Sequence, residues 1–297
     1  MVFATWILIA LAASAIGSMT VVVDKILITK YSKDWIYLTA FFGVINFLPA
    51  LVLLFFIDLF VLAIYLGLIA GILFRMASFF YMKSISLEEA SRVVPLFLTS
   101  VVFVLIMESI FLDEQLLLHH YAGMIAVVFG SFIIMTRSVK SLLKISNAFY
   151  FMIMSSFVFA ISEIVLKIAY ARSDFLSIIF WAFTGSMLAS IPILLFKLKK
   201  HHKLFYNKHK LHHILISQLL VFTVALSIYW YALSLGPVSL VTTLGGIDGL
   251  FVFIFAIVLT KFSPTILKEV IDRKTLLTKT AAIGLMIIGL ALINGGV

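Results

Sequence analysis

The sequence contains no cysteine, only 5 prolines, and only 12% charged residues in a chain of 297. Without cysteine the chain can form no disulfide, no thiolate metal site and no cysteine nucleophile. Soluble globular domains carry about 25% charged residues and about 45–50% apolar residues. Here 64% of the residues are hydrophobic and the mean hydropathy is +1.22. Because this excess extends along the whole chain, no large soluble domain is expected, and the bilayer is the expected solvent.

Motifs for nucleotides and metals are also missing. The sequence contains no Walker loop, no Gly-rich dinucleotide turn and no HExxH pair, so ATP-driven transport and metalloprotease chemistry have no support. We expect no cofactor and no metal. The net charge of +9 could suggest a nucleic-acid partner. However, the basic residues lie between apolar segments, where anionic lipid headgroups explain them, so no nucleic-acid partner is expected.

Long apolar runs divide the chain into ten segments. A helix needs about 20 apolar residues to cross the roughly 30 Å hydrocarbon layer. The runs are unbroken, whereas the strands of a membrane barrel would alternate in polarity, so the sequence predicts helices. The expected spans are 4–29, 35–57, 60–83, 90–111, 118–136, 147–170, 175–197, 212–234, 237–260 and 276–294. Residues 1–23 could imitate a signal peptide, but they lack a basic start, and we expect them to remain as the first helix.

Lysine and arginine are distributed unequally between the two sides. The connections after odd-numbered spans carry nearly all of them, whereas the connections after even-numbered spans carry Arg172 alone. Basic loops stay in the cytoplasm, so we expect a multi-pass protein of the cell membrane with both termini outside. The longest basic connection, 197–213, holds six lysines and five histidines. It is either a solvated loop that faces lipid headgroups or a segment for metal binding or pH sensing.

The two halves of the chain resemble each other. Residues 23–26 (VDKI) parallel residues 165–168 (VLKI), and further on Ser86-Leu87 parallels Ser234-Leu235. Each unit contains five spans, and an odd number turns the second unit upside down in the membrane. Inverted repeats of this kind occur in secondary transporters, with the substrate near the midplane. The sequence therefore predicts an all-α integral membrane fold, with inverted five-helix repeats at 1–140 and 141–297 around a central cavity.

Motifs in the fourth and ninth spans point to a known family. The first copy is Glu89-Ala90-Ser91-Arg92-Val93-Val94-Pro95-Leu96, followed by Glu114, Gly123 and Gly130. The second copy is Gly236-Pro237-Val238-Ser239-Leu240-Val241, followed by Leu250-Phe251, Gly284 and Gly289. Their order and duplication resemble two tandem EamA domains, an arrangement typical of the drug/metabolite transporter superfamily.

The resemblance implies a ten-helix carrier with a central cavity, and often the export of amino acids or other metabolites. It does not fix the substrate, because family members move amino acids, sugars, nucleotides and drugs. Relatives often carry a proline midway along the fourth and ninth helices, where this chain has Val101 and Gly249. If these helices are broken here, the breaks must come from Pro95 and from Gly245, Gly246 and Gly249.

Charged residues inside the spans are the most informative. Each costs about 2.5–3.5 kcal/mol at a helix centre on insertion scales. They are Asp24, Lys25, Arg75, Glu108, Glu163, Lys167 and Asp248. Arg75 could hold a substrate carboxylate or phosphate, or it could pair with Glu163 or Asp248.

The other charges also allow two interpretations each. Glu163 and Lys167 have the spacing of a pair on one helix face, but a buried Glu163 could instead take up a proton and couple transport to the proton gradient. Asp24 and Lys25 have the same two options, proton coupling or an ion pair. Asp248 lies among glycines and could meet an amine, a proton or a buried partner, whereas Glu108 could simply reach water.

Two aromatic clusters occupy equivalent positions in the repeats, Phe79-Phe80-Tyr81 and Tyr229-Trp230-Tyr231. They form either an interfacial belt or a cavity wall that stacks on an aromatic or cationic substrate. Smaller polar residues could contact substrate or join helices: Asn46, Ser155, Ser156, Thr223 and Ser227. Gly67 and Gly71 indicate a close-packing face, and they could also serve a rocking contact.

Together these features predict a secondary transporter that works by alternating access on a small organic metabolite, such as an amino acid or drug-like compound, and that is not an enzyme. The expected substrate-binding residues are Arg75, Glu163, Asp248, Phe79, Tyr81, Tyr229 and Trp230. The alternatives are a flippase for a lipid-linked or phosphorylated headgroup and, in another class, an intramembrane enzyme. Membrane lipids are expected partners, and the chain is expected to be a monomer or homodimer.

Overall fold

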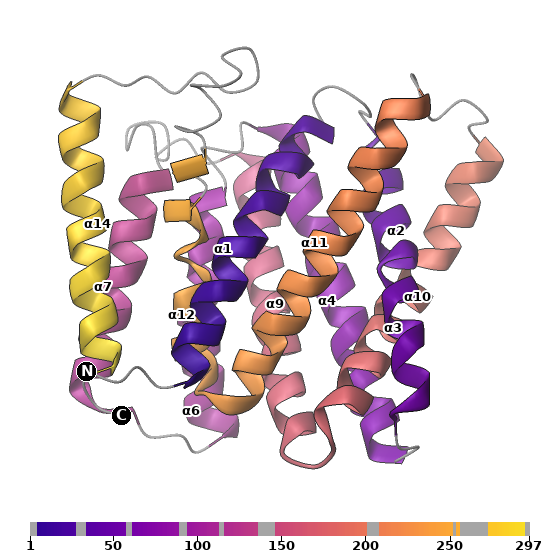
Figure 1. The fold of residues 1–297 in the computed structure, drawn as a ribbon, viewed down its shortest axis with the longest axis horizontal. Helices are drawn as coiled ribbons and strands as arrows, with labels where there is room; N and C mark the ends of the chain where they lie inside the picture. Colours follow the sequence, from indigo (N-terminus) through magenta and orange to yellow (C-terminus); the bar gives the residue numbers. More distant parts are fainter. Residues whose placement is uncertain are drawn as a thin grey trace.

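The computed structural model describes residues 5–27, 34–57, 61–88, 94–112, 116–135, 146–200, 208–251, 254–255 and 273–294. The regular elements in these ranges are all helices, and they stand side by side as a bundle (Figure 1). The first half contains α1 (Thr5–Ile26), α2 (Trp35–Ile45), α3 (Phe47–Ala50), the 3-10 helix η2 (Leu51–Phe55), α4 (Val61–Leu87), the 3-10 helix η3 (Val94–Leu98), α6 (Thr99–Phe111) and α7 (Leu118–Met135). The second half contains α9 (Asn147–Tyr170), α10 (Phe175–Lys200), α11 (Lys208–Leu235), α12 (Val238–Gly245) and α14 (Arg273–Asn294).

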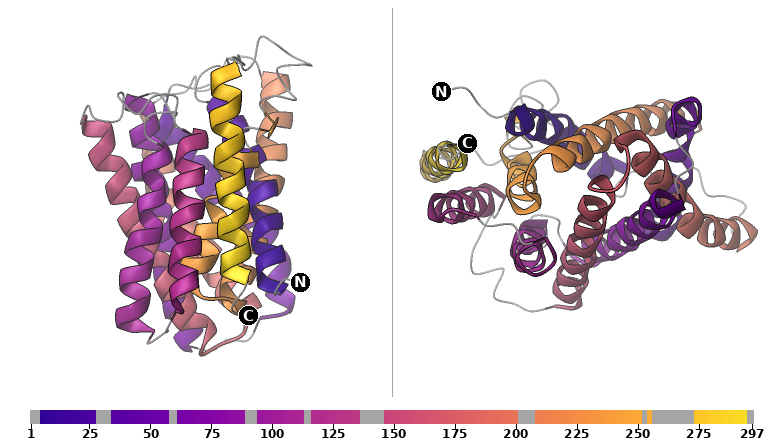
Figure 2. Two further views of the ribbon diagram at one scale, coloured as in Figure 1. Left: turned by 90° about the vertical axis from the view of Figure 1, so that its left-hand side faces the viewer. Right: turned by 90° about the horizontal axis from the view of Figure 1, so that it is seen from below.

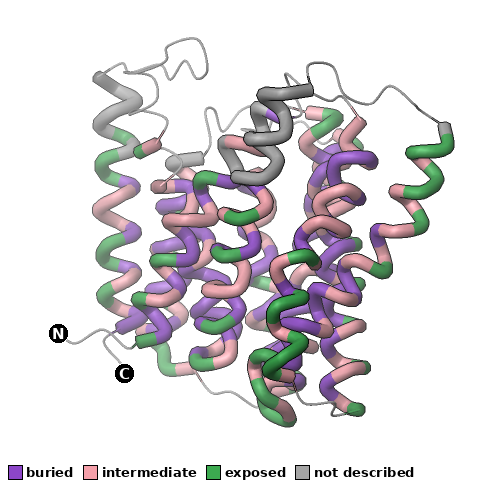
Figure 3. Tube along the Cα trace, turned by 45° about the vertical axis from the view of Figure 1, so that its right-hand side comes forward, coloured by how far each residue is buried: buried purple, intermediate pink, exposed green. Residues whose placement is uncertain are grey.

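Each of the ten expected spans contains a described helix. By length and composition six are apolar enough to cross a membrane: Trp35–Phe55, Val61–Leu87, Val94–Phe111, Asn147–Tyr170, Phe175–Lys199 and Gln218–Leu235. Four shorter apolar helices account for the rest: Thr5–Thr20, Leu118–Ile133, Val238–Phe251 and Thr280–Asn294. Large apolar side chains face outward, with Phe55 86% and Leu118 85% exposed, and exposed positions recur along the outer helices (Figure 3). Such a surface suits lipid, and the chain is a multi-pass membrane protein.

Three spans are broken. The fourth starts as 3-10 helix η3, which contains Pro95, and the ninth leaves α-helical geometry after Gly245, with Gly246 as the C-cap of α12. The sequence left open whether these two spans are broken, and both breaks lie at residues named above as their source. The break in the second span was not expected: α2 ends at Ile45, and the chain continues through α3 into η2. Pro49 lies in α3 and cannot donate a backbone hydrogen bond to a continuous helix.

Helix α4 is held against α9 by serines. Ser162 Oγ donates to the Ala70 carbonyl at 2.9 Å, and Ser155 Oγ donates to the Ala77 carbonyl at 2.8 Å. Near the other end, Ser84 Oγ donates to the Ala148 carbonyl at 2.7 Å. Ser155 therefore joins helices, which was one of its two predicted roles. In the rest of the bundle α1 packs on α11 and α12, α6 on α9 and α12, and α7 on α14 at one edge (Figure 2).

Glycines line the contact between α4 and α10. A Cβ atom on Gly71 would lie 1.8 Å from the carbonyl oxygen of Ala182, and one on Gly185 would lie 2.2 Å from the carbonyl oxygen of Leu68. A Cβ on Gly67 would lie 2.6 Å from the Cβ of Trp181. Only residues without a side chain allow the two backbones to come this close. The predicted close-packing face at Gly67 and Gly71 is confirmed.

Gly71→Ala is expected to lower the melting temperature of the purified protein in detergent. The new methyl group meets the backbone of α10, which cannot move aside as a side chain can, and overpacking of this kind costs about 1–3 kcal/mol. Gly284→Ala is the matched control, because a Cβ at Gly284 meets nothing within 4 Å. It should leave the melting temperature unchanged or slightly raised. Equal melting temperatures for the two variants would contradict the assignment of the α4–α10 contact.

Candidate substrate site

A buried carboxyl group without a partner lies at the junction of α9 and α11. Glu163 of α9 is 0% exposed, and neither of its carboxyl oxygens has a hydrogen-bond partner in the structure. A buried carboxyl group is normally hydrogen-bonded, because an unpaired one loses its hydration without compensation. The Glu163 carboxyl group is therefore the strongest candidate for a functional group in the described part of the chain.

Aromatic side chains surround Glu163. Tyr229 and Trp230 of α11 approach its carboxyl group as side-chain hydrogen-bond donors, although neither meets strict hydrogen-bonding geometry. Tyr170, at the end of α9, is an electrostatic neighbour, and its hydroxyl is buried without a partner. The Trp230 indole is 0% exposed, and its N–H has no partner either. Polar edges of two aromatic rings thus remain unsatisfied beside the carboxyl group.

Trp230 is fixed by its apolar neighbours. Its ring centroid lies 5.6 Å from that of Phe74 in α4 and 5.3 Å from that of Phe183 in α10. Tyr229 turns instead to α12, where its hydroxyl lies 3.4 Å from Thr242 Oγ1, and its ring would be 3.3 Å from a Cβ on Gly245. The cluster Tyr229-Trp230 is therefore part of the bundle interior. Of the two interpretations left open by the sequence, a wall inside the bundle fits this pair better than an interfacial belt.

A second polar group connects α1, α4, α11 and the segment after α12. Gln218 Nε2 of α11 donates to Asp24 Oδ1 at 2.7 Å. The Tyr81 hydroxyl of α4 interacts electrostatically with both Asp24 and Asp248. Three expected functional residues, Asp24, Tyr81 and Asp248, thus lie near one another although they are far apart in the sequence. Lys25 lies in α1, but its side chain is outside the described residues, and Phe79 belongs to neither group within the described part.

Arg75 lies apart from these two groups. It is 4% exposed, its Nε donates to Ser186 Oγ of α10 at 2.9 Å, and its Nη1 donates to the Thr39 carbonyl of α2 at 3.2 Å. Neither Glu163 nor Asp248 is among its partners in the described part of the chain. The guanidinium therefore spans the junction of α2, α4 and α10.

Glu163 and Lys167 do not form the ion pair that their spacing suggests, because Glu163 has no partner in the structure. Lys167 Nζ instead donates to the Leu233 carbonyl at 3.2 Å and to the Gly236 carbonyl at 2.7 Å. These carbonyls lie at the C-terminal end of α11, where a cation is favourable to the helix dipole. A spacing of four residues places two side chains on one helix face, but it does not show which groups a neighbouring helix offers.

Glu108 is a structural residue that the sequence interpretation missed. It is 1% exposed, and its carboxylate accepts hydrogen bonds from the backbone N–H groups of Val238 and Ser239, the latter at 3.0 Å. Glu108 therefore caps the N-terminus of α12 from α6, rather than reaching water as expected. The helix start after Pro237 was the only sequence signal for this contact, because such a start leaves N–H groups without partners.

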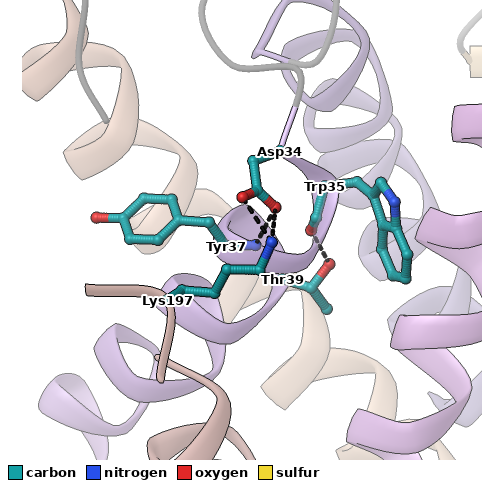
Figure 4. Close-up of polar contacts among 5 residues, drawn as sticks. All are labelled: Asp34, Trp35, Tyr37, Thr39 and Lys197. Atoms are coloured by element: carbon teal, nitrogen blue, oxygen red, sulfur yellow. Dashed lines mark hydrogen bonds and ion pairs between the residues drawn. The ribbon is translucent and has the colours of Figure 1, made fainter. Parts of the chain in front are cut away.

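Asp34 and Lys197 join the start of α2 to the end of α10 (Figure 4). Lys197 Nζ lies 2.7 Å from Asp34 Oδ2, and Asp34 also accepts the N–H of Tyr37 at 3.1 Å as the N-cap of α2. Lys197 thus belongs to a helix and an ion pair, whereas the sequence placed it in the long basic loop. Residues 201–207 of that loop and its histidine side chains lie outside the described residues.

Comparisons with known proteins agree with the fold and the motifs. The model of the EamA-like transporter family matches residues 4–136, which is the first of the two expected units. No curated protein matches the chain. A solved structure described only as "Crystal structure of protein" aligns with a TM-score of 0.70 and 13% identity, covering 98% of this chain and 96% of the other. At this identity the likeness concerns the fold alone. Residues 4–136 are thus an EamA-like transporter domain, a type of domain found in the drug/metabolite transporter superfamily.

Proposed function

We propose that this protein is a secondary carrier of a small organic molecule that works by alternating access. The observation that carries the proposal is Glu163, a completely buried carboxyl group without a partner in the interior of a membrane bundle. Ionisable residues inside membrane proteins are rare, and those that are kept mark substrate or ion pathways. We assign substrate contact to Glu163, Tyr229 and Trp230, and a second contact zone to Asp248 and Tyr81.

Arg75 has a smaller part in this proposal than the sequence suggested. Both of its hydrogen bonds go to protein groups of α2 and α10, which favours a bracing role over direct contact with an anionic substrate. Asp24 is held by Gln218 and remains a candidate for proton coupling together with Glu163.

We further propose that residues 1–140 and 141–297 form two units of opposite orientation. In such an arrangement α1 corresponds to α9, α4 to α11, and α6 to α12. The packing of α4 on α9 then has its equivalent in the packing of α11 on α1, and the contact of α6 with α9 has its equivalent in that of α12 with α1. Exchanging the two units leaves the α7–α14 and α2–α10 contacts unchanged, because each of these contacts joins a helix to its own equivalent in the other unit. These equivalent contacts favour a two-fold relation between the units, which is common in carriers that rock between two states, whereas the extensive α4–α10 contact has no equivalent α2–α11 contact among those described.

The basic connections are proposed to face the cytoplasm, with export as the direction of transport. The ends of α4 and α10 that carry Lys83, Lys197 and Lys199 lie opposite the start of α1 and the end of α14 (Figure 1). Basic residues on the cytoplasmic side would then leave both termini outside.

Reconstitution of the full chain into proteoliposomes tests the carrier function. Radiolabelled amino acids, nucleosides, organic cations and sugar phosphates are offered outside, and counterflow is measured by preloading the vesicles with the same unlabelled compound. Saturable counterflow of at least one compound, absent from protein-free vesicles, is the expected result. Transbilayer movement of fluorescent phospholipid without counterflow of any soluble compound would contradict the proposal and would favour a flippase.

A further inference from the structure

We infer that the transported substrate carries a positive charge, a protonated amine or a quaternary ammonium group, and that it binds at the Glu163 carboxylate among Tyr170, Tyr229 and Trp230. The inference rests on the proposed carrier function and names its substrate class. Three observations support it. Glu163 has no basic partner among the described residues, and aromatic residues lie near it. The nearby cations Arg75 and Lys167 are already bound to other protein groups.

The first step concerns Glu163 itself. Its two carboxyl oxygens are buried and have no partner, and the only basic residue one turn away, Lys167, binds carbonyls of α11. An isolated carboxylate in a medium of low dielectric constant is very costly. The charge must therefore be neutralised by something that the chain does not supply, a proton or a bound cation. A substrate cation that replaces the proton would regain much of that cost.

The second step concerns the aromatic rings. Trp230 and Tyr229 come from α11, and Tyr170 comes from the end of α9, so aromatic residues of two helices lie near the carboxyl group. The face of an aromatic ring attracts a cation, and tryptophan attracts it best. A carboxylate beside aromatic rings is therefore suited to an alkylammonium group, whose charge the carboxylate balances and whose carbon atoms the rings cover. An anion would meet the negative faces of the rings and the negative carboxylate.

The third step concerns two further carboxylates inside the spans, Asp24 and Asp248. Asp24 lies near the end of α1 at Ile26, Asp248 follows the break after Gly245, and Glu163 lies seven residues before the end of α9 at Tyr170. Tyr81 links the first two carboxylates, and the Tyr229–Thr242 contact lies between α12 and the Glu163 site. Asp24 and Asp248 are therefore two further carboxylates near Tyr81, and both belong to spans of the bundle.

The fourth step concerns the cations of the interior. Arg75 is bound to Ser186 and the Thr39 carbonyl, on the side of α4 that faces α2 and α10. Lys167 is bound at the C-terminal end of α11. Among the described residues assigned to the two contact zones, the charged groups Glu163, Asp24 and Asp248 are thus all acidic, and like charges repel an anionic substrate.

Uptake of three similar aromatic compounds tests the inference. Proteoliposomes that contain the full chain are given phenyltrimethylammonium, phenylalanine or benzenesulfonate, which carry a fixed positive charge, a zwitterionic group and a fixed negative charge. We expect uptake of the cation to exceed uptake of each of the other two by at least about tenfold, which corresponds to about 1.4 kcal/mol. Glu163→Gln should abolish this uptake. Asp34→Asn, which neutralises a carboxylate outside the site, should retain it.

Several outcomes would overturn the inference. One is uptake of phenylalanine or benzenesulfonate by the unaltered protein that equals or exceeds its uptake of phenyltrimethylammonium. Another is uptake of phenyltrimethylammonium by Glu163→Gln at the rate of the unaltered protein. The third is that the unaltered protein takes up none of the three compounds. Even if Glu163→Gln fails to fold, the relative uptake of the three compounds by the unaltered protein tests whether the substrate is a cation. Counterflow of neutral or anionic compounds in the wider panel would leave the carrier function standing and remove only the cationic substrate, whereas no counterflow at all would remove both.

Discussion

Glu108→Ala is expected to cause the largest loss of stability of any single substitution proposed for this protein. The Glu108 carboxylate accepts the N–H groups of Val238 and Ser239, which start α12. Removing it leaves two buried donors unsatisfied and removes a negative charge from the positive end of a helix dipole. Each buried donor left without an acceptor costs about 1–3 kcal/mol. The measurement is the melting temperature in detergent, together with the monodisperse fraction recovered by size-exclusion chromatography.

Glu108→Gln is the matched variant. An amide oxygen of the same size can still accept one of the two N–H groups, but without the charge, so we expect a melting temperature between those of the wild type and Glu108→Ala. Ser109→Ala changes the neighbouring residue, whose hydroxyl bonds only to the Ile106 carbonyl of its own helix, and should have little effect. A melting temperature of Glu108→Ala equal to that of Ser109→Ala would contradict the capping role.

Trp230→Ala should produce the second largest effect, on both stability and transport. The indole is completely buried between Phe74 and Phe183, and truncation of a buried tryptophan to alanine costs about 3–5 kcal/mol. Trp230→Phe separates packing from polar function, because it keeps most of the buried area and removes the unpartnered N–H. We expect Trp230→Phe to melt close to the wild type but to bind phenyltrimethylammonium several-fold more weakly, since phenylalanine is a weaker partner for cations.

Trp181→Phe is the control for this comparison. Trp181 also has a buried N–H without a partner, but it lies in α10 against Gly67 and is not among the residues that interact with Glu163. The substitution is chemically identical to Trp230→Phe and should leave binding of phenyltrimethylammonium, measured by equilibrium dialysis in detergent, unchanged. Equal weakening by both variants would show that the indole of Trp230 has no special part in the site.

The spans of this protein could be predicted well from its sequence. Apolar runs of about 20 residues have few alternatives to a membrane helix, and each of the ten expected runs contains a described helix. The breaks at Pro95 and after Gly245 followed from residues that weaken helices. The break in the second span also contains a proline, Pro49, but a proline inside an apolar run often only kinks a membrane helix. Its effect depends on the neighbouring helices, which the sequence does not specify.

The partners of the charged residues could not be predicted. Glu108 and Ser239 are separated by 131 positions, and Lys167 binds carbonyl groups, which every residue carries. Spacing along one helix showed which residues share a face, as for Glu163 and Lys167, but the energy of a buried charge depends on atoms from other helices. Glu163, Tyr229 and Trp230 were among the seven expected substrate-binding residues, and the structure places these three near one another, while their role in binding stays a prediction. The sequence-based prediction gave Arg75 too much weight, because the acceptors Ser186 and the Thr39 carbonyl have no distinctive pattern.

The two sides of α4 differ in how firmly they are attached. Hydroxyl groups of Ser155 and Ser162 tie α4 to α9 at fixed heights, so a shift along this contact would break hydrogen bonds. The glycine contact with α10 has no protruding side chains at Gly67 and Gly71, and the Arg75–Ser186 hydrogen bond links side chains across it. Small sliding of packed helices is a recognised type of conformational change. The pair α4–α9 should therefore travel as one rigid body, with α10 as the surface along which it shears.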